Sequence, residues 1–160
     1  MTAVKQTALY KRHLEINGNM VPFAGFLLPT YYTSINQEHA AVRKKAGLFD
    51  VAHMGEFIVS GNDSSAFMQK MTVNDVLSLS TGQAQYSAMC YENGGVVDDL
   101  LIYKRDESYL LVVNAANLEK DLQWLEAHVE GQVSIKNVSD ETNLIALQGP
   151  KTRKILQPLI

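Results

Sequence analysis

The stretch from residue 86 to residue 114, YSAMCYENGGVVDDLLIYKRDESYLLVVN, contains three largely apolar segments separated by two polar turns. The first turn, residues 92–95, carries the Asn-Gly pair that favours a tight hairpin, where the backbone needs a positive φ. The second turn, around residues 105–108, is polar throughout. Short turns of this kind connect antiparallel neighbours, so the stretch predicts a three-stranded antiparallel meander.

Two adjacent carboxylates, Asp98 and Asp99, lie inside the middle predicted strand. Aspartate is depleted in strands, and a charged carboxylate is costly to bury, so the pair breaks a local rule of the kind that functional sites break. Side chains alternate along a strand, which places the two carboxylates on opposite faces and excludes a directly paired acid and base. Asp99 shares its predicted face with Leu101 and Tyr103.

Asp99 is therefore the preferred candidate for a group that handles a proton or a ligand N–H, since an acid on a mostly apolar face needs an unusual partner. A structural alternative is that either aspartate hydrogen-bonds the Gly94-Gly95 turn. Tyr86 lies across the predicted hairpin, and tyrosines both stack on flat ligands and fill ordinary strand positions. The residues alone thus predict an α+β domain with a candidate carboxylate site.

Other segments alternate between helical and strand patterns around this meander. A capping-box pattern at Ser34 and Gln37 predicts the start of a helix, and Asn114 is well placed to cap another. Gly149-Pro150 predicts a further helix with proline at its first position. The predicted helices cover residues 35–46 and about 115–130, and a short helix capped by Asn62 or Asp63 runs through Met71. The predicted strands cover residues 55–60, 132–138 and 143–147. Helices mixed with antiparallel strands define the α+β class.

Composition limits the possible function classes. The chain has 160 residues, is 46% hydrophobic and carries a net charge of −3, which gives no electrostatic basis for binding nucleic acid or an anionic membrane. Its single cysteine fits a reducing compartment, and no apolar stretch approaches the ~20 residues that span a bilayer. The four histidines are scattered singly, so we expect no metal site and a cytoplasmic protein.

Several motifs together resemble one family, the T-protein of the glycine cleavage system, a tetrahydrofolate-dependent aminomethyltransferase. The resemblance is carried by LFDVAHMGE (48–56), AQYSAMCYENGGVVDDLLIY (84–103), LLVVNAANLEKDLQWL (110–125) and LIALQGP (144–150). It implies mixed, largely antiparallel sheets with packed helices and a ferredoxin-like folate-binding domain. It also implies that residues 1–140 form this domain, that residues 141–160 begin a following one, and that the chain is truncated.

The resemblance further implies a reaction and a set of site residues. The enzyme passes the methylene of an aminomethyl group on lipoylated H-protein to tetrahydrofolate, and it releases ammonia and 5,10-methylenetetrahydrofolate. Asp99 matches the catalytic aspartate of the family. The positions that line the folate in the family match Met54, Tyr86, Tyr103 and Asn114. Functional side chains that the family carries beyond residue 160 are absent from this sequence, so the fragment alone is expected to be inactive. Two alternatives remain: a non-catalytic folate-binding module of the iron–sulfur maintenance type, and the folate domain of a dimethylglycine or sarcosine dehydrogenase relative.

Overall fold

The computed structural model describes residues 4–160, and the chain divides into two compact units. One unit combines the segment ending at His53 with residues 143–160, and the other contains residues 54–142. Residues 143–160 thus belong to the same unit as the beginning of the chain. The expected division into residues 1–140 and 141–160 stays a prediction.

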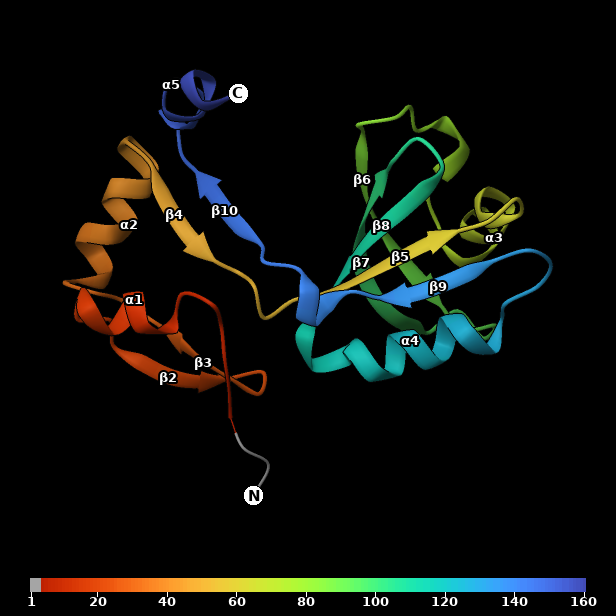
Figure 1. Cartoon of the computed structure of the whole chain (residues 1–160), viewed down its shortest axis with the longest axis horizontal. Coiled ribbons are helices and arrows are strands. Elements are labelled where there is room, and N and C mark those ends of the chain that lie inside the picture. The colour runs from red at the N-terminus through yellow and green to blue at the C-terminus, as the bar shows by residue number, and fades with distance from the viewer. Residues whose placement is uncertain (1–3) are drawn as a thin grey trace. The chain divides into compact units, whose positions relative to one another are not determined.

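The unit of residues 54–142 is a five-stranded sheet with two helices (Figure 1). The strand order is β6-β7-β8-β5-β9, and every neighbouring pair is antiparallel. Without β6 the order is β7-β8-β5-β9, with a helix after β5 and another after β8, which is the ferredoxin-like β-α-β-β-α-β arrangement. Its elements are β5 (Gly55–Ser60), α3 (Ser64–Met71), β6 (Ala84–Cys90), β7 (Val96–Lys104), β8 (Ser108–Val113), α4 (Leu118–Ala127) and β9 (Ser134–Asn137).

The predicted meander is confirmed as β6, β7 and β8. Gly94 in the first turn has a φ of +84°, the positive value that the Asn-Gly pair favours. The amide N–H of Gly95 donates to Asn93 Oδ1 at 3.0 Å, so the asparagine side chain closes this turn. The alternative in which Asp98 or Asp99 closes it is wrong, because both carboxylates bond elsewhere.

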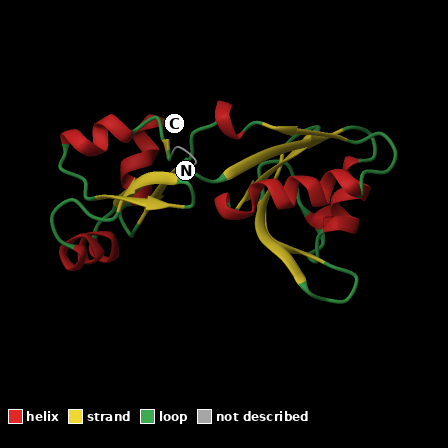
Figure 2. Cartoon of the chain, turned by 90° about the horizontal axis from the view of Figure 1, so that it is seen from below, coloured by secondary structure: helices red, strands yellow, loops and turns green. Residues whose placement is uncertain are grey.

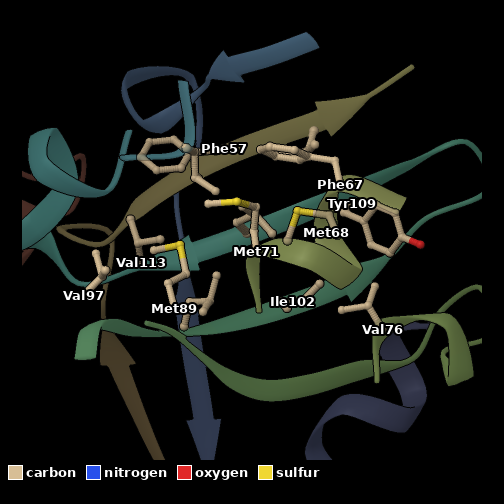
Figure 3. Close-up of a cluster of buried hydrophobic side chains, with 14 residues drawn as sticks. Phe57, Phe67, Met68, Met71, Val76, Met89, Val97, Ile102, Tyr109 and Val113 are labelled. Atoms are coloured by element: carbon tan, nitrogen blue, oxygen red, sulfur yellow. The ribbon is translucent and has the colours of Figure 1, made fainter. Parts of the chain in front are cut away.

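One face of the sheet forms the core with α3 and α4 (Figure 3). Phe57 and Val59 from β5 and Leu111 from β8 are completely buried there, and Leu125 from α4 and Met68 from α3 pack against the same cluster. The alternation of β5 predicts this face, since Phe57 and Val59 both point toward the helices. Burying such side chains is the main favourable contribution to the stability of the unit.

The described part of the other unit, residues 4–53 and 143–160, has short strands and three α-helices (Figure 2). Strand β3 lies between β1 and β2 in one sheet, and β4 pairs with β10 in another. The β2–β3 pair is antiparallel. The elements are β1 (Lys5–Gln6), α1 (Tyr10–Glu15), β2 (Met20–Phe23), β3 (Phe26–Pro29), α2 (Ile35–Lys44), β4 (Gly47–Asp50), β10 (Ile145–Gln148) and α5 (Thr152–Leu156).

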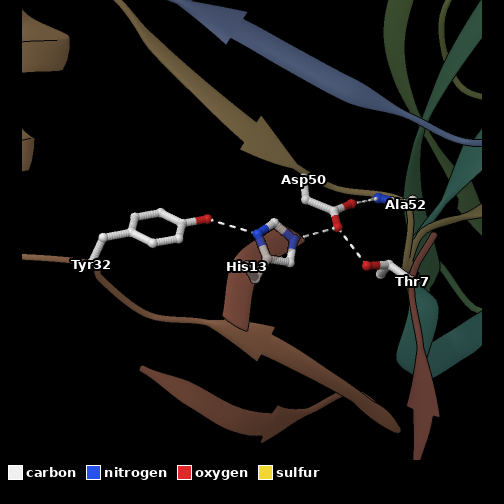
Figure 4. Close-up of polar contacts among 5 residues, drawn as sticks. All are labelled: Thr7, His13, Tyr32, Asp50 and Ala52. Carbon is white, nitrogen blue, oxygen red and sulfur yellow. Dashed lines mark hydrogen bonds and ion pairs between the residues drawn. The ribbon is translucent and has the colours of Figure 1, made fainter. Parts of the chain in front are cut away.

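A chain of hydrogen bonds links four segments of this unit (Figure 4). Asp50 Oδ2 accepts from Thr7 Oγ1 at 2.6 Å and lies 2.9 Å from His13 Nε2, and His13 Nδ1 lies 2.9 Å from Tyr32 Oη. Burial opposes ionisation of Asp50, but the hydrogen bonds from His13, Thr7 and Ala52 outweigh it and lower the pKa of the carboxyl. Burial raises the pKa of Tyr32, so this tyrosine stays a hydrogen-bond donor. The network holds these four segments of the unit together.

Three predicted local features are wrong. Ser34 makes no side-chain cap on α2; instead Glu38 Oε1 accepts from the backbone N–H groups of Tyr32, Thr33 and Ser34. Asn114 does not cap α4, because its amide turns toward the aspartates of β7. The C-terminal helix begins at Thr152, so Pro150 lies before its first position.

Replacing Val59 with alanine tests the core. Val59→Ala removes two buried methyl groups and leaves a cavity, so we expect a loss of about 2 kcal/mol in the free energy of unfolding. Val96→Ala is the matched control, because Val96 also lies in a strand but is 63% exposed. Urea unfolding of the two variants measures the difference. Equal midpoints would contradict the assignment of the core face.

Candidate active site on the face opposite the helices

The second face of the sheet, here called the site face, carries Tyr86, Asp99, Leu101 and Tyr103. Strand alternation turns these side chains away from α3 and α4, while Asp98, Leu100 and Ile102 of the same strand are buried. Asp99 is half-buried, and Tyr86 is 62% exposed. From Asp98 onward, the predicted division of β7 into two faces therefore agrees with the burial of its residues, whereas Val97, at a register shift between β6 and β7, is also buried in the core.

Tyr86 and Asp99 are joined by a short hydrogen bond. Tyr86 is paired with Leu101 in the register of β6 and β7, so Asp99 lies diagonally across from it, within reach of a long side chain. Tyr86 Oη donates to Asp99 Oδ2 at 2.6 Å. This hydrogen bond to the carboxylate raises the pKa of Tyr86, so the phenol keeps its proton.

Asn114 joins both aspartates from the end of β8. Its Nδ2 lies 3.0 Å from Asp99 Oδ1, 3.2 Å from Asp98 Oδ1 and 3.3 Å from Asp98 Oδ2. Leu100 pairs with Val113, so Asn114 follows directly where β8 stops beside β7. One amide therefore connects two carboxylates whose side chains leave the strand on opposite faces.

The structure does not bring Tyr103 or Met54 into this hydrogen-bonded group. Tyr103 lies four residues beyond Asp99 on the same face, about 13 Å along the strand. Met54 immediately precedes β5, and Gly55 pairs with Val113, so Met54 lies level with Asn114 at the end of the strands. Asp99, Tyr86 and Asn114 thus form the centre of the site, and the other two predicted positions lie on its strands.

Two acidic residues near this centre were missed by reasoning from the sequence. Glu56 lies in a cross-strand row with Val112, Leu101 and Tyr86, and it is only 1% exposed. Neither of its carboxylate oxygens has a hydrogen-bond partner among the described residues, and burial raises its pKa to about 7. A carboxyl that exchanges its proton near neutral pH therefore belongs to the site face.

Asp121 of α4 is the second missed residue and is completely buried. Burial, followed by the hydrogen bond to Asp98 and its charge, raises the pKa of Asp121 to about 8. A sequence signal existed, because residues 118, 121, 122 and 125 follow the i, i+3, i+4, i+7 spacing of a buried helix face. No group of three His, Cys, Asp or Glu side chains within residues 4–160 is arranged to hold a metal ion.

The chain thus contains a ferredoxin-like α+β unit whose candidate site is centred on one carboxylate, Asp99. Tyr86 and Asn114 hold that carboxylate by hydrogen bonds. The chain belongs to the family described as the GCVT N-terminal domain, whose model matches residues 9–160. No helix within the described part of the chain is long and apolar enough to cross a membrane.

Named relatives agree with this family. The chain is 53% identical over 155 residues to an aminomethyltransferase of Bacillus licheniformis and 54% identical over 157 residues to one of Anoxybacillus flavithermus, covering 96% and 98% of this chain. It covers 43% of each of those relatives. The solved glycine cleavage system aminomethyltransferase T from Bartonella henselae superposes with a TM-score of 0.91 at 31% identity, over 97% of this chain and 43% of that one.

The buried acid Glu56 generates a prediction about stability and pH. Its pKa is raised in the folded state, so its contribution to stability is present below its ordinary pKa near 4.5 and is lost as the pH rises through about 7. Glu56→Gln removes this dependence, so the free energy of unfolding should fall less steeply between pH 5 and 7, by up to about 1.4 kcal/mol per pH unit.

Chemical denaturation at several pH values measures this slope. Glu92→Gln is the control, because Glu92 lies exposed in the hairpin turn. A slope that is the same in native protein, Glu56→Gln and Glu92→Gln would show that Glu56 is already ionised in the folded protein at acidic pH.

Proposed function

We propose that this chain is the N-terminal part of an aminomethyltransferase of the glycine cleavage system. The enzyme passes the methylene of an aminomethyl group carried on the lipoyl arm of H-protein to tetrahydrofolate. The products are ammonia, 5,10-methylenetetrahydrofolate and dihydrolipoyl H-protein. The observation that carries the proposal is the hydrogen-bonded group of Tyr86, Asp99 and Asn114, in a chain whose relatives are named aminomethyltransferases.

Asp99 stabilises the positive charge that develops while the methylene group is transferred. One of its oxygens accepts from Tyr86 and the other from Asn114, so the carboxylate is fixed before substrate arrives. A fixed negative group needs no reorganisation when positive charge appears beside it. Asp99 therefore stabilises a cationic iminium-like intermediate and assists proton movement at the reacting folate nitrogens. Each oxygen keeps a further lone pair for this purpose.

Met54, Tyr86, Tyr103 and Asn114 line the folate. The ring of Tyr86 is largely exposed and offers a flat surface for stacking on a heteroaromatic ligand. Tyr103 extends the same face along β7, and Met54 supplies a flexible apolar side chain beside the end of β8. The site face thus combines stacking surface with a charged group near one end.

H-protein is the proposed macromolecular partner, and the cytoplasm is the proposed compartment. The proposal includes no metal, no nucleic acid and no membrane. Because this chain covers 43% of its named relatives, we propose that turnover needs the remainder of their length and that these 160 residues alone are inactive. Activity is therefore tested with the full-length gene product.

Replacing Asp99 with asparagine tests the proposal. Asp99→Asn keeps the shape of the side chain and removes its charge, so we expect turnover to fall by about 10²- to 10⁴-fold, the usual contribution of a positioned acid–base group. The assay follows methylenetetrahydrofolate formation from tetrahydrofolate and H-protein loaded with the aminomethyl group. Asp106→Asn is the matched control, because Asp106 lies in the exposed turn between β7 and β8.

Three outcomes distinguish an aminomethyltransferase that uses Asp99, one that does not use Asp99, and a non-catalytic folate-binding module. A loss confined to Asp99→Asn, with folate binding and the folded state retained, supports both the reaction and the role of Asp99. Equal turnover in the two variants keeps the reaction and rejects Asp99 as a catalytic residue. Folate binding by the native protein without any turnover would instead favour a non-catalytic folate-binding module.

A further inference from the structure

Behind Asp99, on the helix side of β7, lies a buried pair of acids that the proposed reaction does not use. Asp98 of β7 is 7% exposed and Asp121 of α4 is 0% exposed. Two ionised carboxylates cannot remain side by side in a buried position, because the repulsion and the loss of hydration are both unfavourable. As a carboxylate, neither oxygen of Asp121 has a hydrogen-bond donor among the described residues.

A single proton resolves this conflict. Burial raises the pKa of Asp121 to about 8, followed by its hydrogen bond with Asp98 and the nearby charges of Asp98 and Asp99, while Lys120 acts in the opposite direction. Burial also opposes ionisation of Asp98, but hydrogen bonds from Asp121, Asn114 and Asn117 outweigh it and lower its pKa. Asp121 therefore carries the proton at neutral pH and donates it to ionised Asp98. The two acids titrate as a coupled pair.

The ionised Asp98 fixes the orientation of Asn114. The nitrogen of that amide is surrounded by acceptors: both carboxylate oxygens of Asp98, together with Oδ1 and the backbone carbonyl of Asp99, at 3.0 to 3.4 Å. Nitrogen is the only end of the amide that can donate to them. One hydrogen serves the Asp98 carboxylate and the other serves Asp99. The amide oxygen consequently points away from these acceptors.

Lys120 holds the helix that carries Asp121 against the strand that carries Asp98. Its Nζ donates to the backbone carbonyl oxygen of Val97 at 2.5 Å, one residue before Asp98. This contact connects α4 to β7 independently of the acid pair. Asp121 therefore stays near Asp98 in either protonation state.

We propose that Asp98 and Asp121 share one proton and act as positioning residues for Asn114, so that its nitrogen holds Asp99 and its oxygen is presented to an N–H group of the bound substrate. The identity of the substrate in this inference rests on the proposed function. The orientation of the Asn114 amide is independent of the proposed function. Loss of the shared proton places two negative charges behind Asn114 and alters its hydrogen bonds. The site then responds to pH through a group that touches no substrate.

The first experiment observes the amide directly and needs no activity. The full-length protein is labelled with ¹⁵N-asparagine, and the side-chain NH₂ signals of Asn114, assigned by their absence in Asn114→Ser, are followed from pH 6 to pH 9.5. We expect them to shift with a midpoint near 8, where Asp121 loses its proton. In Asp121→Asn a permanent amide donor replaces the acid, so the shift should disappear. The side-chain signals of Asn93 in the exposed hairpin turn serve as the internal control.

The second experiment measures turnover across the same pH range. The alkaline fall in kcat that follows deprotonation of Asp121 should be absent in Asp121→Asn. If both variants fold, Asp121→Asn should retain at least tenfold more turnover at pH 7 than Asp121→Leu, because only the amide can donate to Asp98. Thermal unfolding of both variants, followed by circular dichroism, shows whether they are folded under the assay conditions.

The outcomes separate this inference from the proposed function. Asn114 signals that do not move between pH 6 and 9.5, or that move equally in Asp121→Asn, overturn the role of the shared proton. Signals that move in the native protein only, in a protein that transfers no one-carbon unit, support the positioning pair and reject the proposed reaction.

Discussion

The alternation of β7 from Asp98 to Tyr103 is the constraint on which the rest of the candidate site depends. Ile102 and Leu100 must face α3 and α4 to form the core, so every second residue of the strand faces the other way. Shifting the register by one residue would expose the core side chains and bury Asp99 instead. The energy that fixes the position of Asp99 is therefore mostly hydrophobic and comes from residues that never touch a ligand.

Asp98 falls on the core side of that alternation and has to be accommodated there. A buried ionised carboxylate is tolerated when hydrogen bonds replace its lost hydration. Asn114 and protonated Asp121 supply those bonds, and Asn114 at the same time reaches Asp99. The amide of Asn114 thus supplies a hydrogen bond that buried Asp98 needs, and the same amide holds Asp99 in place. This shared amide explains how two adjacent acids can occupy opposite faces and still influence each other.

Local patterns were sufficient for the parts of the site that lie within the meander. The Asn-Gly turn and the period of two placed Tyr86 next to β7 and separated Asp99 from Asp98, and the register of β6 and β7 agrees with both. The same patterns gave wrong predictions where a side chain had two possible hydrogen-bond partners nearby. Ser34 and Asn114 both have the residue type of a helix cap, but Glu38 accepts the N–H groups that precede α2, and Asn114 turns to the aspartates. Such choices depend on tertiary contacts, which propensity does not contain.

Glu56 and Asp121 show why the remaining acids were missed. Glu56 alternates with buried Phe57 and Val59, so a period of two assigns it to solvent, although the site face at that point is covered. Asp121 lies on the helical stripe of Leu118, Leu122 and Leu125, yet a charged residue is normally placed outside such a stripe. Both errors come from treating a carboxyl as necessarily charged. A buried acid that keeps its proton behaves as a neutral hydrogen-bond donor, and this state depends on neighbours from other elements, here Asp98 for Asp121. Acids that occupy apolar positions of an otherwise regular pattern are therefore informative, since the fold must either pair them or neutralise them.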